Sequence, residues 1–226
     1  MLLNIFRSIF DWSEVWALFI PLTYLLIYKP KNNWVTPVKG YLLIALILNI
    51  AIDFMWYVNK NDWFNSRLGN RWNNNILYNI QSINRLLFFS WFFSTLGTRF
   101  KKITGILPGI FLLAALVYFT FFKTFLSISS YLMAMEAGFL LIYCLWFTYT
   151  LIKEDQPNTQ VSHPSYWVVG GLTVYTTVSF FIFLFYNYLM DHYKDYSISV
   201  WDIHNVLFIV LCICISIAFY YESDRS

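Results

Sequence analysis

Five ionisable side chains interrupt long apolar stretches of this sequence, and these are the groups with which the chain could do chemistry. They are Asp53, Arg85, Glu136, Asp202 and His204. A charged group surrounded by apolar residues or lipid is costly, so such residues normally face the inside of a helix bundle and pair there or form a site. Three carboxylates stand against one arginine and one histidine. This excess predicts either a carboxylate that takes up a proton or a bound cation.

Polar neighbours at helical spacing extend this set. Tyr78, Gln81 and Arg85 share one face of a helix, and Trp201, His204 and Asn205 adjoin on another. Asp202 and His204 are two residues apart and point in different directions, so at most one can face the bundle axis, and we expect it to be His204. The predicted ligand site comprises Asp53, Tyr78, Gln81, Arg85, Glu136, Trp201, Asp202, His204 and Asn205.

Two interpretations of this set stay open. In the first, Arg85 forms a structural pair with one carboxylate, and the other groups are protonated or solvated. In the second, the groups line a polar cavity, open to the outside, that binds a cation, a proton or a small polar ligand. If a metal is bound, we expect Asp53, Glu136 and His204 as its ligands, although residues from three helices give no ligand spacing that supports such a site.

Several catalytic and cofactor motifs are missing from the sequence. No lysine lies in any predicted span, which excludes a retinal Schiff base, and we predict no cofactor. The chain has 3 histidines and contains neither an HExxH motif nor a GxSxG serine elbow. A Gly-rich phosphate loop and a basic stripe are also absent, so we expect no nucleotide or nucleic-acid partner. These absences favour a protein that is not an enzyme.

The elements that must position these side chains are membrane-spanning helices. The chain has 226 residues, of which 59% are hydrophobic and 12% charged, against about 25% charged in soluble domains. A spanning helix needs roughly 20 mostly apolar residues, and seven stretches qualify: 13–28, 40–58, 76–97, 103–122, 128–152, 165–190 and 198–221. Their apolar runs are continuous, so helices rather than barrel strands are expected. We predict one all-α, seven-helix transmembrane domain over residues 1–226, with no soluble domain.

Charge in the connecting segments predicts the orientation. Eight lysines and arginines fall on the side that holds the C-terminus and six on the other, so the positive-inside rule places the N-terminus outside and the C-terminus inside. At a rise of about 1.5 Å per residue, the five ionisable residues then lie at similar depth in the outer half of the membrane. Residues 1–12 are expected to lie as a short amphipathic segment at the interface.

Two pairs of glycines indicate close approach between helices. Gly105 and Gly109 form a GxxxG motif beside Pro108 in a stretch without a buried ionisable group. This spacing fits a homodimer interface, and it also fits ordinary packing or a bend at the proline. Gly170 and Gly171 indicate close packing or a hinge in the sixth stretch.

Three segments carry a resemblance to a known family. They are EAGFLLIY from Glu136, PSYWVVGGLTVYTT at the start of the sixth stretch, and WDIHNV at the start of the seventh. With the seven-span layout, they resemble uncharacterised small bacterial seven-helix membrane proteins that are often encoded near sensor histidine kinases. The chain has Ser82 and Phe208 where that family often has a carboxylate and an asparagine. The resemblance implies a sensory or accessory role in the bacterial inner membrane.

Three functions are compatible with the sequence. The first is a receptor-like sensor or signalling accessory with an outward polar pocket and an inner-side partner, contacted through residues 98–102 or the C-terminal YESDRS. The second is a cation or small-solute transporter or channel, in which the fourth span links two groups of three. The third is an intramembrane lipid-modifying enzyme that uses a carboxylate with His204, or a bound metal.

Overall fold

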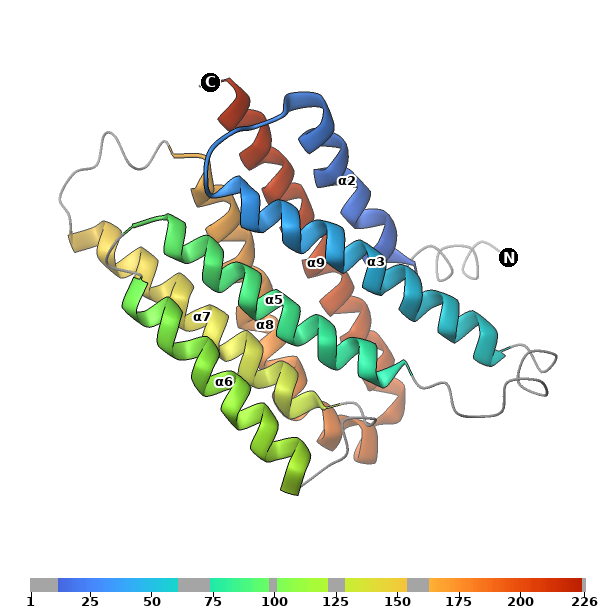
Figure 1. Ribbon diagram of the computed structural model, residues 1–226. Coiled ribbons are helices and arrows are strands. Elements are labelled where there is room, and N and C mark those ends of the chain that lie inside the picture. The colour runs from blue at the N-terminus through green and yellow to red at the C-terminus, as the bar shows by residue number, and fades with distance from the viewer. Residues whose placement is uncertain (1–11, 61–73, 98–100, 122–128, 154–162, 225–226) are drawn as a thin grey trace.

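Seven α-helices make up the described part of the chain (Figure 1). The computed structural model describes residues 12–60, 74–97, 101–121, 129–153 and 163–224. The helices are α2 (Ser13–Tyr28), α3 (Val35–Lys60), α5 (Asn75–Thr95), α6 (Lys101–Phe121), α7 (Ser130–Lys153), α8 (Ser165–His192) and α9 (Lys194–Ser223). Each of them overlaps one predicted stretch, so the predicted helical bundle is confirmed. The predicted interfacial segment 1–12 lies, except for Trp12, outside the described residues.

The start of α3 corrects one prediction. The helix begins at Val35 rather than at residue 40, because Pro37 in its first turn has no N–H that would need an intrahelical partner. Lys39 therefore lies inside this apolar, span-length helix. The prediction that no lysine falls within a span is wrong here. Lys102 and Lys153 also stand at the ends of span-length apolar helices, and all three lysines are exposed.

Length and apolar content separate two helices from the other five. Five helices are long and apolar enough to cross a membrane, namely α3, α6, α7, α8 and α9, which makes this a helical membrane protein. The helix α2 is apolar but has only 16 residues. The helix α5 has 21 residues, but buried polar side chains interrupt it, including Asn79, Gln81, Asn84 and Arg85. Its polar groups are thus turned toward protein rather than toward lipid.

Six of the described helices form a closed ring. The main contacts run from α2 to α3, then to α5, α7, α8 and α9, and from α9 back to α2. The helix α6 packs only on the outside of this ring, against α5 and α7, as Figure 1 shows at the edge of the molecule. Residues that face the inside of the ring can therefore meet from six helices, and α6 is left with its outer surface uncovered.

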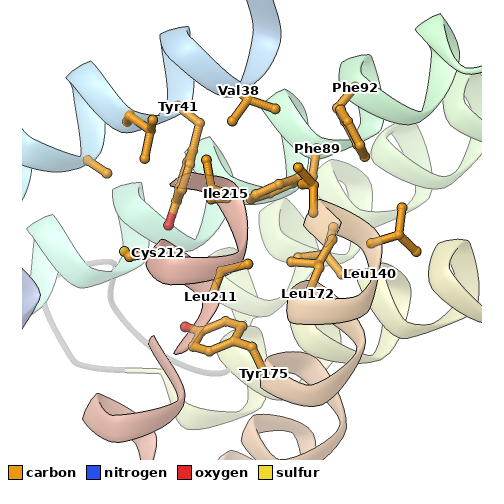
Figure 2. Packing of buried hydrophobic residues seen from close by; sticks show 14 of the residues in the cluster. Val38, Tyr41, Phe89, Phe92, Leu140, Leu172, Tyr175, Leu211, Cys212 and Ile215 are labelled. Atoms are coloured by element: carbon orange, nitrogen blue, oxygen red, sulfur yellow. The ribbon is translucent and has the colours of Figure 1, made fainter. Parts of the chain in front are cut away.

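Aromatic and aliphatic side chains fill much of the ring. Figure 2 shows Tyr41 of α3, Phe89 of α5, Leu140 of α7, Tyr175 of α8 and Leu211 of α9 in one cluster. The rings of Tyr41 and Phe89 lie 4.9 Å apart between centroids. This packed cluster occupies the middle of the bundle and fixes the spacing between helices, so the polar groups beside it are held in place.

Candidate functional site

An ion pair between α5 and α7 lies inside the ring. Arg85 Nη1 stands 3.5 Å from Glu136 Oε1, and Ser82 Oγ donates to Glu136 Oε2 at 3.0 Å. Arg85 is 7% exposed and Glu136 is 1% exposed. Two charges removed from solvent to this degree are stable only when they face each other, so this contact determines how α5 and α7 pack.

The pattern of α5 explains why these groups point inward. Tyr78, Gln81, Ser82 and Arg85 recur at spacings of three and four residues, which places them on one side of the helix. Lipid cannot satisfy hydrogen-bonding side chains, so this side turns toward protein. Trp91, on the opposite side of α5, is exposed.

A hydrogen-bonded relay continues from the ion pair into α8 and α9. Arg85 Nη1 donates to the Tyr175 hydroxyl, and the guanidinium carbon lies 5.1 Å from the centroid of that ring. The Tyr175 hydroxyl lies 3.3 Å from His204 Nε2, and Ser179 Oγ lies 3.0 Å from His204 Nδ1. The relay thus joins α5, α8 and α9 through buried groups.

One assignment of protons satisfies every contact of the relay while His204 is neutral. The Tyr175 hydroxyl accepts from Arg85 and therefore has its own proton free to donate to His204 Nε2. A neutral imidazole has one donor and one acceptor nitrogen. Nδ1 of His204 then carries the ring proton and donates to Ser179 Oγ. The relay ends on a serine hydroxyl, and every member has a partner while His204 stays neutral.

A small cavity borders the relay on the side where α2 and α9 begin. It encloses about 20 Å³ and is lined by Glu14, Tyr78, Gln81, Ser82, Arg85, Met133, Glu136, Phe183, Trp201 and His204. This volume has room for about one water molecule. The buried side-chain oxygen of Gln81 has no hydrogen-bond partner among the described residues, so it is available to whatever occupies the cavity.

The structure brings together six of the nine predicted site residues. Tyr78, Gln81, Arg85, Glu136, Trp201 and His204 all line the cavity. The rings of Tyr78 and Trp201 meet edge to face at 5.9 Å, and the Trp201 and His204 rings are 5.6 Å apart. These contacts place an aromatic wall beside the charged groups, as the shared helix faces predicted.

The other three predicted residues lie elsewhere. Asp53 is half-buried on α3, within electrostatic reach of Glu14 and Tyr78 but not in the cavity lining. Asn205 is buried, also outside the lining. Asp202 is exposed and borders a separate groove on the outer side of α9 with Ile203, Val206 and Leu207. The choice of His204 over Asp202 as the inward residue agrees with this arrangement.

The suggested metal ligands do not come together. Within the described ranges, no three histidine, cysteine or acidic side chains are placed to hold a metal ion. Glu136 and His204 both border the cavity, but Asp53 does not. The set Asp53, Glu136 and His204 is therefore not a joint ligand set in this structure.

Four polar contributors to the site were missed in the sequence. Glu14 falls within the first predicted stretch, near its outer end, and the depth argument applied to Asp53 could have found it. Ser82 lies within the polar stripe of α5 and bonds Glu136. Tyr175 and Ser179 stand in an apolar run of α8, where no pattern distinguishes an inward hydroxyl from one that bonds its own backbone.

No family model matches the chain, and no curated protein or solved structure matches it either. The resemblance to small bacterial seven-helix membrane proteins therefore stays a prediction that rests on the three segments that carry it.

Proposed function

We propose that the protein is a receptor-like sensor of the bacterial inner membrane, and that the small cavity is its ligand site. The observation that carries this proposal is the small volume of the cavity. It lies where α2, α5, α7, α8 and α9 meet, and its volume is close to that of one water molecule. A larger ligand must separate these helices to enter, so binding is converted into helix movement, which is what a receptor requires.

The composition of the lining supports a small cation or protonated amine as the ligand class. Glu14 and Glu136 face Arg85 in the cavity, and Asp53 acts on Glu14 from α3. With both carboxylates ionised, they outnumber the single guanidinium, and the summed charge then favours a cation. The unpartnered oxygen of Gln81 supplies a further acceptor.

The helix α9 offers a route from the cavity to the opposite end of the bundle. His204 borders the cavity, and Glu222 lies 18 residues further on, about 27 Å away at 1.5 Å per residue. There, Trp34 Nε1 donates to Glu222 Oε2 at 3.1 Å, and both residues are buried. A shift of α9 at His204 must therefore strain or release this contact. In the predicted orientation that end faces the inside, where the proposal requires a signalling partner.

A homodimer contact through α6 belongs to the same proposal. Gly105 and Gly109 are exposed on α6, and a Cβ added at either glycine would meet nothing within 4 Å. The helix lies outside the ring, so a second copy could approach this surface without disturbing the cavity.

Thermal unfolding in lipid nanodiscs tests the ligand site. Sodium, potassium and methylammonium chloride are the probes, and choline chloride at equal ionic strength is the reference. At tenfold excess over its Kd, a bound probe is expected to raise Tm by about 3–5 °C. Gln81→Leu should remove this increase, whereas Asn84→Leu, on the same helix but outside the lining, should retain it. A Tm that no probe raises, or an increase that survives Gln81→Leu, would contradict the proposal.

A transporter is the second candidate, favoured by the arrangement of the helices. In the ring, α2, α3 and α5 are followed by α7, α8 and α9 in the same order, with α6 outside. Transporters built from two similar halves bind their substrate between those halves. Uptake of sodium or methylammonium into proteoliposomes that stops on Glu136→Gln would favour transport. Stabilisation by a probe without any uptake would favour the sensor.

A further inference from the structure

A groove at the turn between α2 and α3 collects three lysines. It encloses about 310 Å³ and is lined by Leu25, Leu26, Lys29, Pro30, Lys31, Asn32, Val35, Thr36 and Lys39. It lies at the opposite end of α2 from the cavity. This end of α2 lies beside the C-terminal end of α9 (Figure 1), where the rings of Tyr28 and Tyr220 meet at 5.3 Å.

Backbone geometry brings the three lysines to one place. Lys29 ends α2 in the left-handed conformation, with φ of 46°, and its N–H bonds the carbonyl of Leu25. The chain then turns at Pro30 and re-enters a helix at Val35. Lys39 follows Val35 by four residues, which places both on one side of α3. Lysines at the end of one helix, in the turn and on the next helix therefore surround the same groove.

The charge of the groove is uniformly positive. All three lysines are exposed, and among the residues that line the groove none is acidic. Like charges gathered around one space repel each other, and an anion placed between them removes that repulsion. The groove is therefore complementary to a compact, multiply hydrogen-bonding anion such as a phosphate group.

Apolar side chains continue from the groove along α2. Leu25, Leu26 and Val35 form its apolar wall. Leu26 is 73% exposed and the adjacent Ile27 is 64% exposed. On a membrane-spanning bundle, exposed aliphatic side chains contact acyl chains, whereas lysines at helix ends reach the headgroup layer. A cationic surface that continues into an apolar one matches an anion that carries apolar chains better than it matches a small water-soluble anion.

We propose that this groove binds the phosphate-bearing headgroup of an anionic phospholipid, with the lysines around the phosphate and the acyl chains along α2 and α3. The site is separate from the small cavity and does not depend on the sensor proposal. In the predicted orientation it faces the inner leaflet, where anionic lipids attract basic segments next to helix ends.

Lipid titration of purified protein tests the assignment. The protein is prepared in phosphatidylcholine nanodiscs, and Tm and lipid retention by native mass spectrometry are followed as phosphatidylglycerol replaces phosphatidylcholine. Lys29→Gln/Lys39→Gln is compared with Lys102→Gln/Lys153→Gln, which removes two exposed lysines outside the groove. The groove variant is expected to weaken retention of phosphatidylglycerol about 30-fold, because two lysine contacts with the bound phosphate are lost and each contributes about a fivefold factor. The control variant should retain the lipid as the parent does.

Additional ligands distinguish a bound phospholipid from other sources of phosphate. Inorganic phosphate and glycerol 3-phosphate are added to protein in phosphatidylcholine nanodiscs, and neither should reproduce the stabilisation by phosphatidylglycerol. Equal stabilisation by inorganic phosphate would show that the ligand is a free anion and would overturn the proposed phospholipid. Equal retention of phosphatidylglycerol by the groove and control variants would overturn the assignment of the lipid site to this groove. If the groove variant fails to fold in phosphatidylcholine, Lys39→Gln alone is compared with Lys102→Gln, with a fivefold loss expected.

Discussion

At the scale of single residues, the bundle depends on a small number of buried polar contacts. Glu136 receives a hydrogen bond from Ser82 and faces Arg85, which also donates to Tyr175. In a membrane interior no water can replace a lost hydrogen-bond partner, so each buried polar group depends on its protein neighbour for its hydrogen bonds. Removing one member leaves its neighbours buried without a partner, and this makes single substitutions here informative.

Arg85→Ala is expected to destabilise the protein strongly. It leaves Glu136, 1% exposed, without its counter-charge. Breaking a buried ion pair by removing one partner costs about 3–5 kcal/mol, which corresponds to a fall in Tm of roughly 6–20 °C for a chain of this size. Thermal unfolding in detergent measures it, with Lys153→Ala as the exposed control. A variant that melts with the parent would show that the pair does not support the fold.

Tyr175→Phe tests the relay. The substitution keeps the ring in the core and removes only the hydroxyl that joins Arg85 to His204. Leaving buried polar groups unsatisfied costs about 1–3 kcal/mol, whereas Tyr149→Phe, an exposed control, should be neutral. A double-mutant cycle with Ser179→Ala should give a coupling above about 0.5 kcal/mol. Strictly additive effects would mean that Tyr175 and Ser179 do not act through the same histidine.

At the scale of elements, close contact between α8 and α9 holds the relay in register. A Cβ added at Gly171 would lie 2.7 Å from Cys214 Cβ and 3.1 Å from its Sγ. No other residue type leaves that much room, so the second glycine of the pair serves close packing rather than a hinge. The adjacent Gly170 is exposed and would meet nothing within 4 Å.

Neighbouring glycines provide a matched pair of substitutions. Gly171→Ala is expected to push α8 and α9 apart and to lower the free energy of unfolding by about 1–3 kcal/mol. Gly170→Ala should be neutral or stabilise by up to about 1 kcal/mol, because alanine has the better helix propensity. Both are measured by thermal unfolding in the same detergent. Equal effects of the two substitutions would argue against a tight crossing at Gly171.

The outer helix α6 has its own test. Gly105→Leu/Gly109→Leu is expected to convert a dimer into a monomer, because bulky side chains prevent close approach at a small-residue face. Ile110→Phe, at an exposed position next to Gly109 but turned about 100° around the helix axis, is the control. Light scattering and crosslinking of an Ile106→Cys variant measure the oligomeric state. A parent that is already monomeric in native lipid would contradict the contact.

At the scale of the whole molecule, the two ends of the ring differ in what they contain. One end holds the small cavity between Glu14 and Trp201, and the other holds the buried Trp34–Glu222 contact and the lysine groove. The helices that form the ring cross between these ends. A helix movement at one end is therefore transmitted to the other end through packed helices, and α9 contributes residues to both ends.

The orientation of these ends is tested by cysteine labelling in intact cells. Trp12 and Asn32 are exposed at opposite ends of α2. A membrane-impermeant maleimide should label Trp12→Cys from outside and should label Asn32→Cys only after permeabilisation. The parent chain is the background control, and it measures any labelling of its own cysteines, of which Cys144 and Cys212 are buried and Cys214 is half-buried. The reverse pattern would show that the N-terminus lies inside.

The sequence by itself determined the helices and the membrane environment. Apolar runs of this length can satisfy their backbone in lipid only as helices, so the boundaries were predicted within a few residues, apart from the starts of α3 and α9. It also determined that Arg85, Glu136 and His204 lie inside the bundle, because lipid penalises a charged or strongly polar group wherever it points outward.

Only the tertiary structure decided which helices are neighbours and which uncharged groups join the site. Lipid tails and a protein core are equally apolar, so an apolar residue gives no sign of which side of its helix faces protein. This is why the sequence could not place α6 outside the ring or turn Tyr175 and Ser179 inward. It also explains Asp202, two residues from His204. Asp202 lies near the start of the apolar part of α9 at Ser199, where its carboxylate can reach the interface, so helix packing rather than charge decided that it lies outside the cavity.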